Sequence, residues 1–222
     1  MVRLLKPLDY YQQKYGAWRY GLQKMYLLME KQHNRGQEGA GIAGVRMDAK
    51  PGEEYIWRER VTGKNAIQEI FMKINDKVDG VDAELLNDIE TVKSNFPFVA
   101  DMYLGYLRYS PSKQNGSGIM QIHPLLRRHN WKNRTLVLAG DFSLTNVDEL
   151  FDYLTLKGQH PRDVADTFLL LEQMGFHLDK EIQASYDLIK QRYSNDVTIT
   201  QKIEEQLNLG NIIRKSESMW DG

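Results

Sequence analysis

The chain has 222 residues and no cysteine, with 29 basic against 30 acidic residues and a net charge of −1. Without cysteine, these residues hold no disulfide bond, no thiolate zinc site and no cysteine nucleophile. The balanced charge gives no general attraction to nucleic acid or to anionic membranes, so we expect neither as a partner. No apolar run approaches the roughly 18 residues of a membrane-spanning helix or forms a signal-peptide core, which predicts a soluble, cytoplasmic protein.

The first half of the chain alternates between helix and strand patterns. Leu22, Met25, Tyr26 and Met29 recur at helical spacing, and three glycines follow that break the pattern. Two strands are expected on either side of a Pro-Gly turn. The expected elements are a short strand and a polar turn region within residues 1–15, a helix over 20–31, strands over 42–47 and 54–59, helices over 65–74 and 83–94, and a strand over 101–109.

The second half becomes helical after one buried strand. The apolar run at 135–139 is too short for a helix and is typical of a buried strand. Asn146, with Glu149 three residues later, is the signature of a helix start, and Gly158 and Gly175 should end two successive helices. The expected helices cover residues 147–156, 162–174, 180–192 and 197–207. Since no repeat or linker interrupts the chain, residues 1–222 are predicted to form one domain.

A glycine-rich run, Asn34-Arg-Gly-Gln-Glu-Gly-Ala-Gly-Ile-Ala43, joins the first long helix to a strand. Glycine permits a close approach between the backbone and a ligand. The same spacing also suits an ordinary helix-to-strand turn. The run lacks the lysine and the serine or threonine of a phosphate-binding loop, which excludes that class of site.

An arginine lies near the end of the aromatic strand, in Gly105-Tyr-Leu-Arg-Tyr-Ser110. The planar guanidinium of Arg108 could present a fork of donors to a carboxylate. A strand-end arginine that pairs with a surface acid is the alternative, and it is the commoner case.

Two further runs lie at expected helix starts. Ala139-Gly-Asp-Phe-Ser-Leu-Thr-Asn146 links a buried strand to a helix, where free backbone amides could bind an anion or an oxyanion. Asp163-Val-Ala-Asp-Thr167 opens the next helix, where acidic residues also complement the helix dipole without any ligand. The five histidines show no spacing typical of a metal site, so none is expected.

Taken in order along residues 20–175, these runs resemble the class II glutamine amidotransferase domain, especially that of amidophosphoribosyltransferases. Relative to the family pattern, Asn34 is inserted after His33. The matching runs are Arg35-Gly-Gln-Glu38 with Ala40-Gly-Ile-Ala43, Gly105 to Ser110, Leu144-Thr-Asn146 with Glu149-Leu150, and Asp166-Thr167.

The resemblance implies an α+β fold, the four-layer αββα sandwich of the N-terminal-nucleophile hydrolases. In that family an N-terminal cysteine attacks the side-chain amide of glutamine, with its own α-amino group as the base. By resemblance, Arg108 would hold the carboxylate of L-glutamine and Asp166 its ammonium group. The other implied site residues are Tyr109 and Ser110 in the substrate site, Asp141 and Phe142 at the oxyanion loop, and Arg35, Gly36, Gln37 and Glu38 in support.

The implied partners follow from the same family. Ammonia would pass to phosphoribosyl pyrophosphate in a phosphoribosyltransferase domain that normally belongs to the same chain. Magnesium is expected only with that second domain, so no cofactor is expected for these residues. The sequence leaves homo-oligomerisation open.

The sequence departs from the family pattern at the catalytic positions. The nucleophile is absent, and the first residues match the middle of the first strand, so the fold is expected to be incomplete at both ends. Asp141-Phe142 stands where the family has the asparagine-glycine pair that stabilises the oxyanion. A carboxylate there would repel a developing oxyanion unless it is protonated or turned away.

Three interpretations of function remain open on the sequence. The first is the glutaminase portion of an amidophosphoribosyltransferase-like enzyme, inactive alone without its cysteine. The second is a catalytically inactive glutamine-binding or scaffold module. The third is an amidotransferase with a different acceptor.

Overall fold

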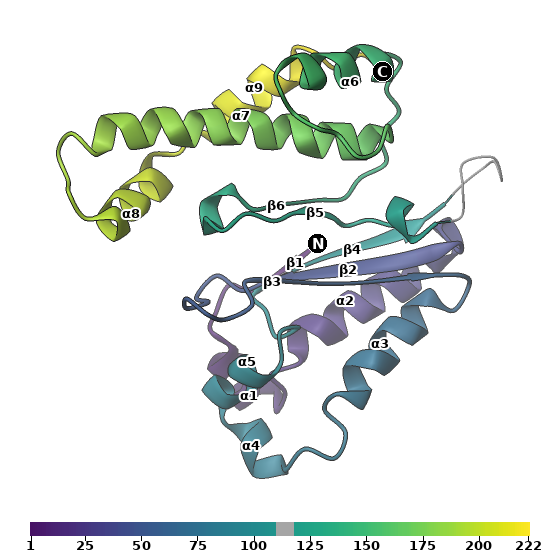
Figure 1. Cartoon of the computed structure of the whole chain (residues 1–222). Helices are drawn as coiled ribbons and strands as arrows, with labels where there is room; N and C mark the ends of the chain where they lie inside the picture. The colour runs from purple at the N-terminus through teal and green to yellow at the C-terminus, as the bar shows by residue number, and fades with distance from the viewer. Residues whose placement is uncertain (110–117) are drawn as a thin grey trace. The chain divides into compact units, whose positions relative to one another are not determined.

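The computed structural model describes residues 1–109 and 118–222. These residues form helices and strands in two compact units, Met1–Pro124 and Leu125–Gly222 (Figure 1). The mixed helix and strand content agrees with the expected class, and the four-layer arrangement stays a prediction. Among the described residues, no helix is long and apolar enough to cross a membrane.

A four-stranded antiparallel sheet organises the first unit, in the order β1-β4-β2-β3. Its central strand β2 pairs along its whole length with both neighbours, and Ile42 lies opposite Gly105 on one side and Glu59 on the other. The edge strand β1 pairs with β4 only at Met102 and Tyr103. The strands are β1 Val2–Arg3, β2 Gly39–Val45, β3 Ile56–Thr62 and β4 Met102–Arg108.

Helices pack on one face of this sheet (Figure 1). Ile42 of β2 is completely buried, and Ile67 and Ile70 of α3 join the same apolar cluster. Burying each such side chain stabilises the fold by about 1.5–3 kcal/mol. The helices are α1 Leu8–Tyr15, α2 Tyr20–Lys31, α3 Ala66–Asp76, α4 Ala83–Asn87 and α5 Ile89–Asn95, with a 3-10 turn η1 His33–Arg35 after α2.

One long helix organises the second unit. The two-stranded ribbon of β5 and β6, and helices α6, α8 and α9, each contact α7 (Figure 1). Leu178, Ile182 and Ile203 belong to one of its two apolar clusters, and Leu150 and Leu169 belong to the other. The elements are β5 Leu125–Arg127, β6 Leu136–Leu138, α6 Val147–Leu156, α7 Asp166–Ile189, α8 Asp196–Gln206 and α9 Leu209–Glu217.

The expected break at Gly175 is wrong, because this residue lies inside the continuous helix α7. A β-carbon at Gly175 would overlap the guanidinium group of Arg127. That guanidinium lies 3.5 Å from the Glu172 carboxylate and 2.6 Å from the Asp179 carboxylate, both on α7. Gly175 therefore admits a neighbouring arginine and does not end the helix.

Other elements also differ from the sequence expectation. Residues of the expected polar turn region form α1, and α9 was not anticipated. The expected helix over 83–94 is divided at Asp88, whose carboxylate accepts hydrogen bonds from the amides of Glu90 and Thr91 and so begins α5. The bounds of α2 and α6 are as predicted.

Candidate functional site

Arg108 is the last residue of β4 and is only 7% exposed. Gly105 faces Met25 and Met29 of α2, so Arg108, three positions later on the strand, points to the opposite face of the sheet. Its Nη2 donates to the side-chain oxygen of Gln121. Its Nε lies 3.8 Å from a carboxylate oxygen of Glu38. The structure thus places a buried guanidinium between an amide and a carboxylate.

The segment that carries Gln121 lies across the sheet on this face. Arg60 of β3 donates through Nη1 to the carbonyl of Ile122, at 3.0 Å. Burial lowers the pKa of Arg60. A β-carbon at Gly41 would overlap the carbonyl oxygen of His123. This glycine therefore permits a close approach, as expected, but the group that approaches is another part of the chain.

The residues expected to support the site lie partly beside Arg108. Gly36 packs against the β4 backbone, where a β-carbon would come within 2.8 Å of the carbonyl carbon of Leu107. The amide of Glu38 donates to the carbonyl of Arg108 at 3.2 Å. Gln37 is exposed. Arg35 ends η1 and lines the nearby cavity.

Of the two residues after Arg108, only Tyr109 belongs to the described part of the chain. Tyr109 is 67% exposed. Ser110 lies outside the described residues. The expected roles of Tyr109 and Ser110 in the substrate site therefore stay predictions.

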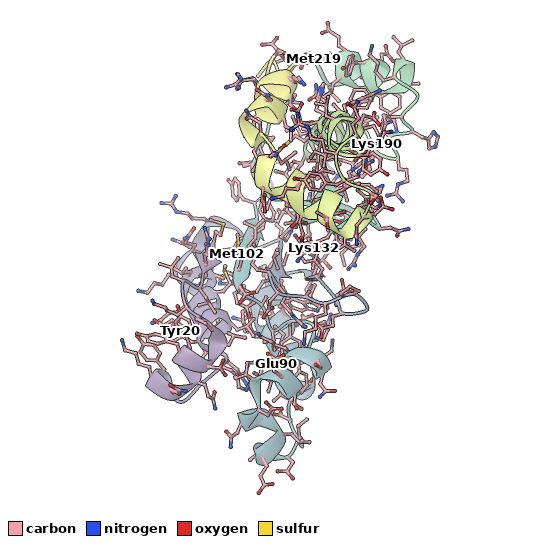
Figure 2. All side chains as sticks on the ribbon, turned by 90° about the vertical axis from the view of Figure 1, so that its left-hand side faces the viewer. Tyr20, Glu90, Met102, Lys132, Lys190 and Met219 are labelled. Carbon is pink, nitrogen blue, oxygen red and sulfur yellow. The ribbon has the colours of Figure 1, made fainter. Side chains whose placement is uncertain are left out.

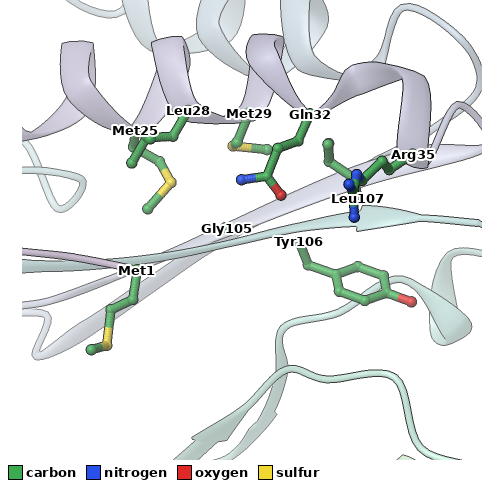
Figure 3. A pocket seen from close by; sticks show the side chains of 9 residues that line it. All are labelled: Met1, Met25, Leu28, Met29, Gln32, Arg35, Gly105, Tyr106 and Leu107. Carbon is green, nitrogen blue, oxygen red and sulfur yellow. The ribbon is translucent and has the colours of Figure 1, made fainter.

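A cavity of about 290 Å³ opens between α2 and β4 (Figure 3). Figure 3 shows Gln32 and Arg35 projecting from the helix side, with Tyr106 on the other side of β4. Gly105 has no side chain to fill this space. Methionines also line the cavity and can adapt to the shape of a bound group. The volume of the cavity is near the lower limit for small-molecule sites.

In the second unit, Asp166 begins α7 and holds a loop. Its Oδ2 accepts a hydrogen bond of 2.9 Å from the amide of Leu144. Asp141 is exposed, and the Phe142 ring folds back over Gly140. Asp166 and the expected oxyanion loop are thus brought together, with the carboxylate bound to the loop backbone.

The sequence did not reveal a second contact to this loop. Thr145 and Asn146 are hydrogen-bonded to the backbone of segment 219–222, whose start is labelled Met219 in Figure 2. Asn146 was expected to cap α6, but its side chain makes no cap bond. Its amide binds the carbonyl of Met219 at 2.9 Å instead. A partner 73 residues away leaves no local pattern by which to find it.

The expected grip on a single glutamine joins residues of both units, because Arg108 belongs to the first and Asp166 to the second. That pairing therefore stays a prediction. No group of three histidine, aspartate or glutamate residues in the described ranges could hold a metal ion.

Comparison with known proteins gives a likeness of fold. One solved structure, a glutamine phosphoribosylpyrophosphate amidotransferase from B. subtilis complexed with ADP and GMP, aligns with 91% of this chain at 22% identity and a TM-score of 0.53. A second, described as the allosteric regulatory enzyme of purine biosynthesis, aligns with 90% at 21% identity and a TM-score of 0.54. The chain spans 31% of the length of each. No protein-family model matches the sequence, and no curated protein is significantly similar to it.

Proposed function

We propose that the chain is the glutaminase portion of an amidophosphoribosyltransferase-like enzyme. Such an enzyme releases ammonia from L-glutamine for transfer to phosphoribosyl pyrophosphate in purine biosynthesis. The fold shared with two solved enzymes over about nine-tenths of the chain supports this function. The observation that carries it is the buried guanidinium of Arg108 at a strand end, in the run that resembles the family's carboxylate clamp.

In this proposal Arg108 binds the α-carboxylate of glutamine and Asp166 binds its α-ammonium group. A charge-assisted, two-point contact from a guanidinium is about twice as strong as a neutral hydrogen bond and fixes the orientation of the carboxylate. Arg108 is already held in place by contacts with Gln121 and Glu38, so little side-chain freedom is lost on binding.

The register of β1 on β4 indicates which part of β4 a preceding strand of such an enzyme would pair with. Val2 lies opposite Tyr103 and Arg3 opposite Met102. In this antiparallel register, a strand that continued β1 upstream would pass Gly105 and Leu107, which line the cavity.

Calorimetry with L-glutamine tests the binding half of the proposal. The parent chain should bind, and Arg108→Ala and Asp166→Asn should each weaken binding at least tenfold, about 1.4 kcal/mol. Arg192→Ala and Asp152→Asn, both at exposed positions, are matched controls and should bind like the parent. Absence of binding by the folded parent chain would refute the proposal.

Glutamate release tests the catalytic half. The chain contains no cysteine, so we expect it to bind glutamine without hydrolysing it. Hydrolysis by these 222 residues alone would show that another group is the nucleophile.

A catalytically inactive glutamine-binding or scaffold module is the second candidate. Asp141 favours it, because a carboxylate at an oxyanion loop opposes the developing negative charge. The coding DNA on both sides of the reading frame separates the candidates. An in-frame Cys-Gly upstream and a phosphoribosyltransferase domain downstream favour the enzyme, and a different downstream domain would indicate another acceptor.

A further inference from the structure

Segment 219–222 lies against the loop that precedes α6. The Asn146 amide binds the backbone on both sides of Trp220, since Nδ2 donates to the carbonyl of Met219 at 2.9 Å and Oδ1 accepts from the amide of Asp221 at 3.3 Å. Thr145 donates to the carbonyl of Asp221 through its amide at 2.7 Å and its hydroxyl at 3.1 Å. Four hydrogen bonds therefore join this segment to two consecutive loop residues.

The side chain of Trp220 anchors the segment to α7. Its indole Nε1 donates to Oε1 of Gln173, a side chain with no exposed surface. The Nε2 of Gln173 has no partner among the described residues. Loss of the indole would leave the buried Oε1 of Gln173 without a hydrogen bond, in addition to Nε2. Because an unsatisfied buried polar atom is costly, the contact strongly favours one position of the segment.

Asp166 holds the same loop one residue earlier. Its carboxylate accepts from the amide of Leu144, directly before Thr145. The loop is thus hydrogen-bonded both to a carboxylate of α7 and to segment 219–222. A shift of the segment would move Thr145 and Asn146, and with them the geometry at Asp166.

We propose that Trp220 is a positioning residue for loop 141–146, acting through segment 219–222. Its role in catalysis rests on the proposed glutaminase function, in which Asp166 binds substrate and the loop supplies oxyanion amides. Among the described residues, the hydrogen bonds of Trp220 go to Glu217 and Gln173 and not to these groups. It fixes the backbone to which Thr145 and Asn146 are bonded.

Hydrogen exchange of the intact chain without ligand tests the positioning role. Trp220→Phe removes the indole donor but keeps an aromatic ring, and Asn146→Ala removes both amide contacts. Each should raise the exchange rates of the Leu144 and Thr145 amides about tenfold and leave the buried middle of α7 unchanged. Glu217→Gln, an exposed change on the neighbouring helix, is the control and should match the parent.

The Leu144 amide is the decisive reporter, because its acceptor Asp166 is unchanged in every variant. Faster exchange at Thr145 alone would mean that the segment only bonds to the loop, and it would overturn the proposal. Glutamine affinity is measured separately. A several-fold loss in Trp220→Phe supports the substrate role, and parental affinity overturns it. If the parent chain does not bind glutamine, the glutaminase function fails together with the substrate role, while the exchange rates still decide whether Trp220 positions the loop.

Discussion

Arg108 binds a neutral amide in this structure, at a place where the proposed substrate would present a carboxylate. Gln121 supplies that amide, and Arg60 and Gly41 hold its segment against the sheet. A carboxylate is a stronger acceptor for guanidinium than an amide oxygen, so a ligand can displace Gln121. A carboxylate at position 121 would instead compete with the ligand.

Replacement of Gln121 should change the chemical reactivity of Arg108. Gln121→Ala should raise the rate at which phenylglyoxal modifies Arg108 several-fold, and Gln121→Glu should lower it. Mass spectrometry of the peptide that contains Arg108 measures both rates. Met120→Ala, on the same turn and exposed, is the control. An unchanged rate in Gln121→Ala would show that Gln121 does not shield the guanidinium.

The contacts that hold Arg108 and the loop at Asp166 could not be found from the sequence. A strand-end arginine and an aspartate at a helix start each stand in a local run, which can be compared with a family pattern. Gln121 bonds to Arg108, 13 positions away, and the backbone of Asp221 bonds to Asn146, 75 positions away. No local spacing encodes such contacts.

At the scale of elements, α7 shows how tertiary packing overrides a local pattern. Glycine is a poor helix former, and Gly175 was therefore expected to end a helix. The helix continues because its neighbours on both sides remain helical and Arg127 occupies the space that a side chain would fill. For α2 and α6, by contrast, the local pattern together with the flanking residues predicted the observed bounds.

A double-mutant cycle tests the fit between Gly175 and Arg127. In an ordinary helix, Gly→Ala stabilises by about 1 kcal/mol. Gly175→Ala should instead destabilise the parent by about 1 kcal/mol, because the methyl group displaces Arg127 from Glu172 and Asp179. In an Arg127→Ala background the same change should stabilise. Denaturant unfolding of the four chains measures the coupling, and additive effects would contradict the packing explanation.

The pairing of α7 with α9 should weaken as the pH falls. Burial, and then the positive charge of Lys215, lower the pKa of His177 below its usual value. The unfolded chain therefore takes up the proton first, and stability is lost as the pH falls through about 6.5. His177→Gln should remove this part of the pH dependence of thermal unfolding, whereas the exposed His160→Gln should not. Parallel pH profiles for the parent and His177→Gln would contradict the prediction.

At the scale of the molecule, the chain was expected to form one domain because no linker was visible in the sequence. The described residues divide into two compact units with separate apolar clusters, and the boundary falls at Pro124 and Leu125. Two compact units can belong to one domain, so the single domain stays a prediction. The mixture of helices and strands was predictable, because the sequence contains both apolar residues at helical spacing and short apolar runs typical of strands.

Separate cores predict separate unfolding. Trp57 lies in the first unit and Trp131 in the second. Variants that keep only one of these tryptophans, with phenylalanine at the other three positions, should report different denaturant midpoints. Coincident midpoints for both reporters and for circular dichroism would show that the two units unfold together.

Gly41 limits the substitutions that the protein can tolerate. Any side chain at this position meets a main-chain oxygen, which no rotamer change can avoid. Even alanine would push His123 and its neighbours away from the sheet, and with them the amide that faces Arg108. In a saturation-mutagenesis survey scored by glutamine binding, Gly41 should be as intolerant as a ligand-binding residue, although it offers a ligand no side chain.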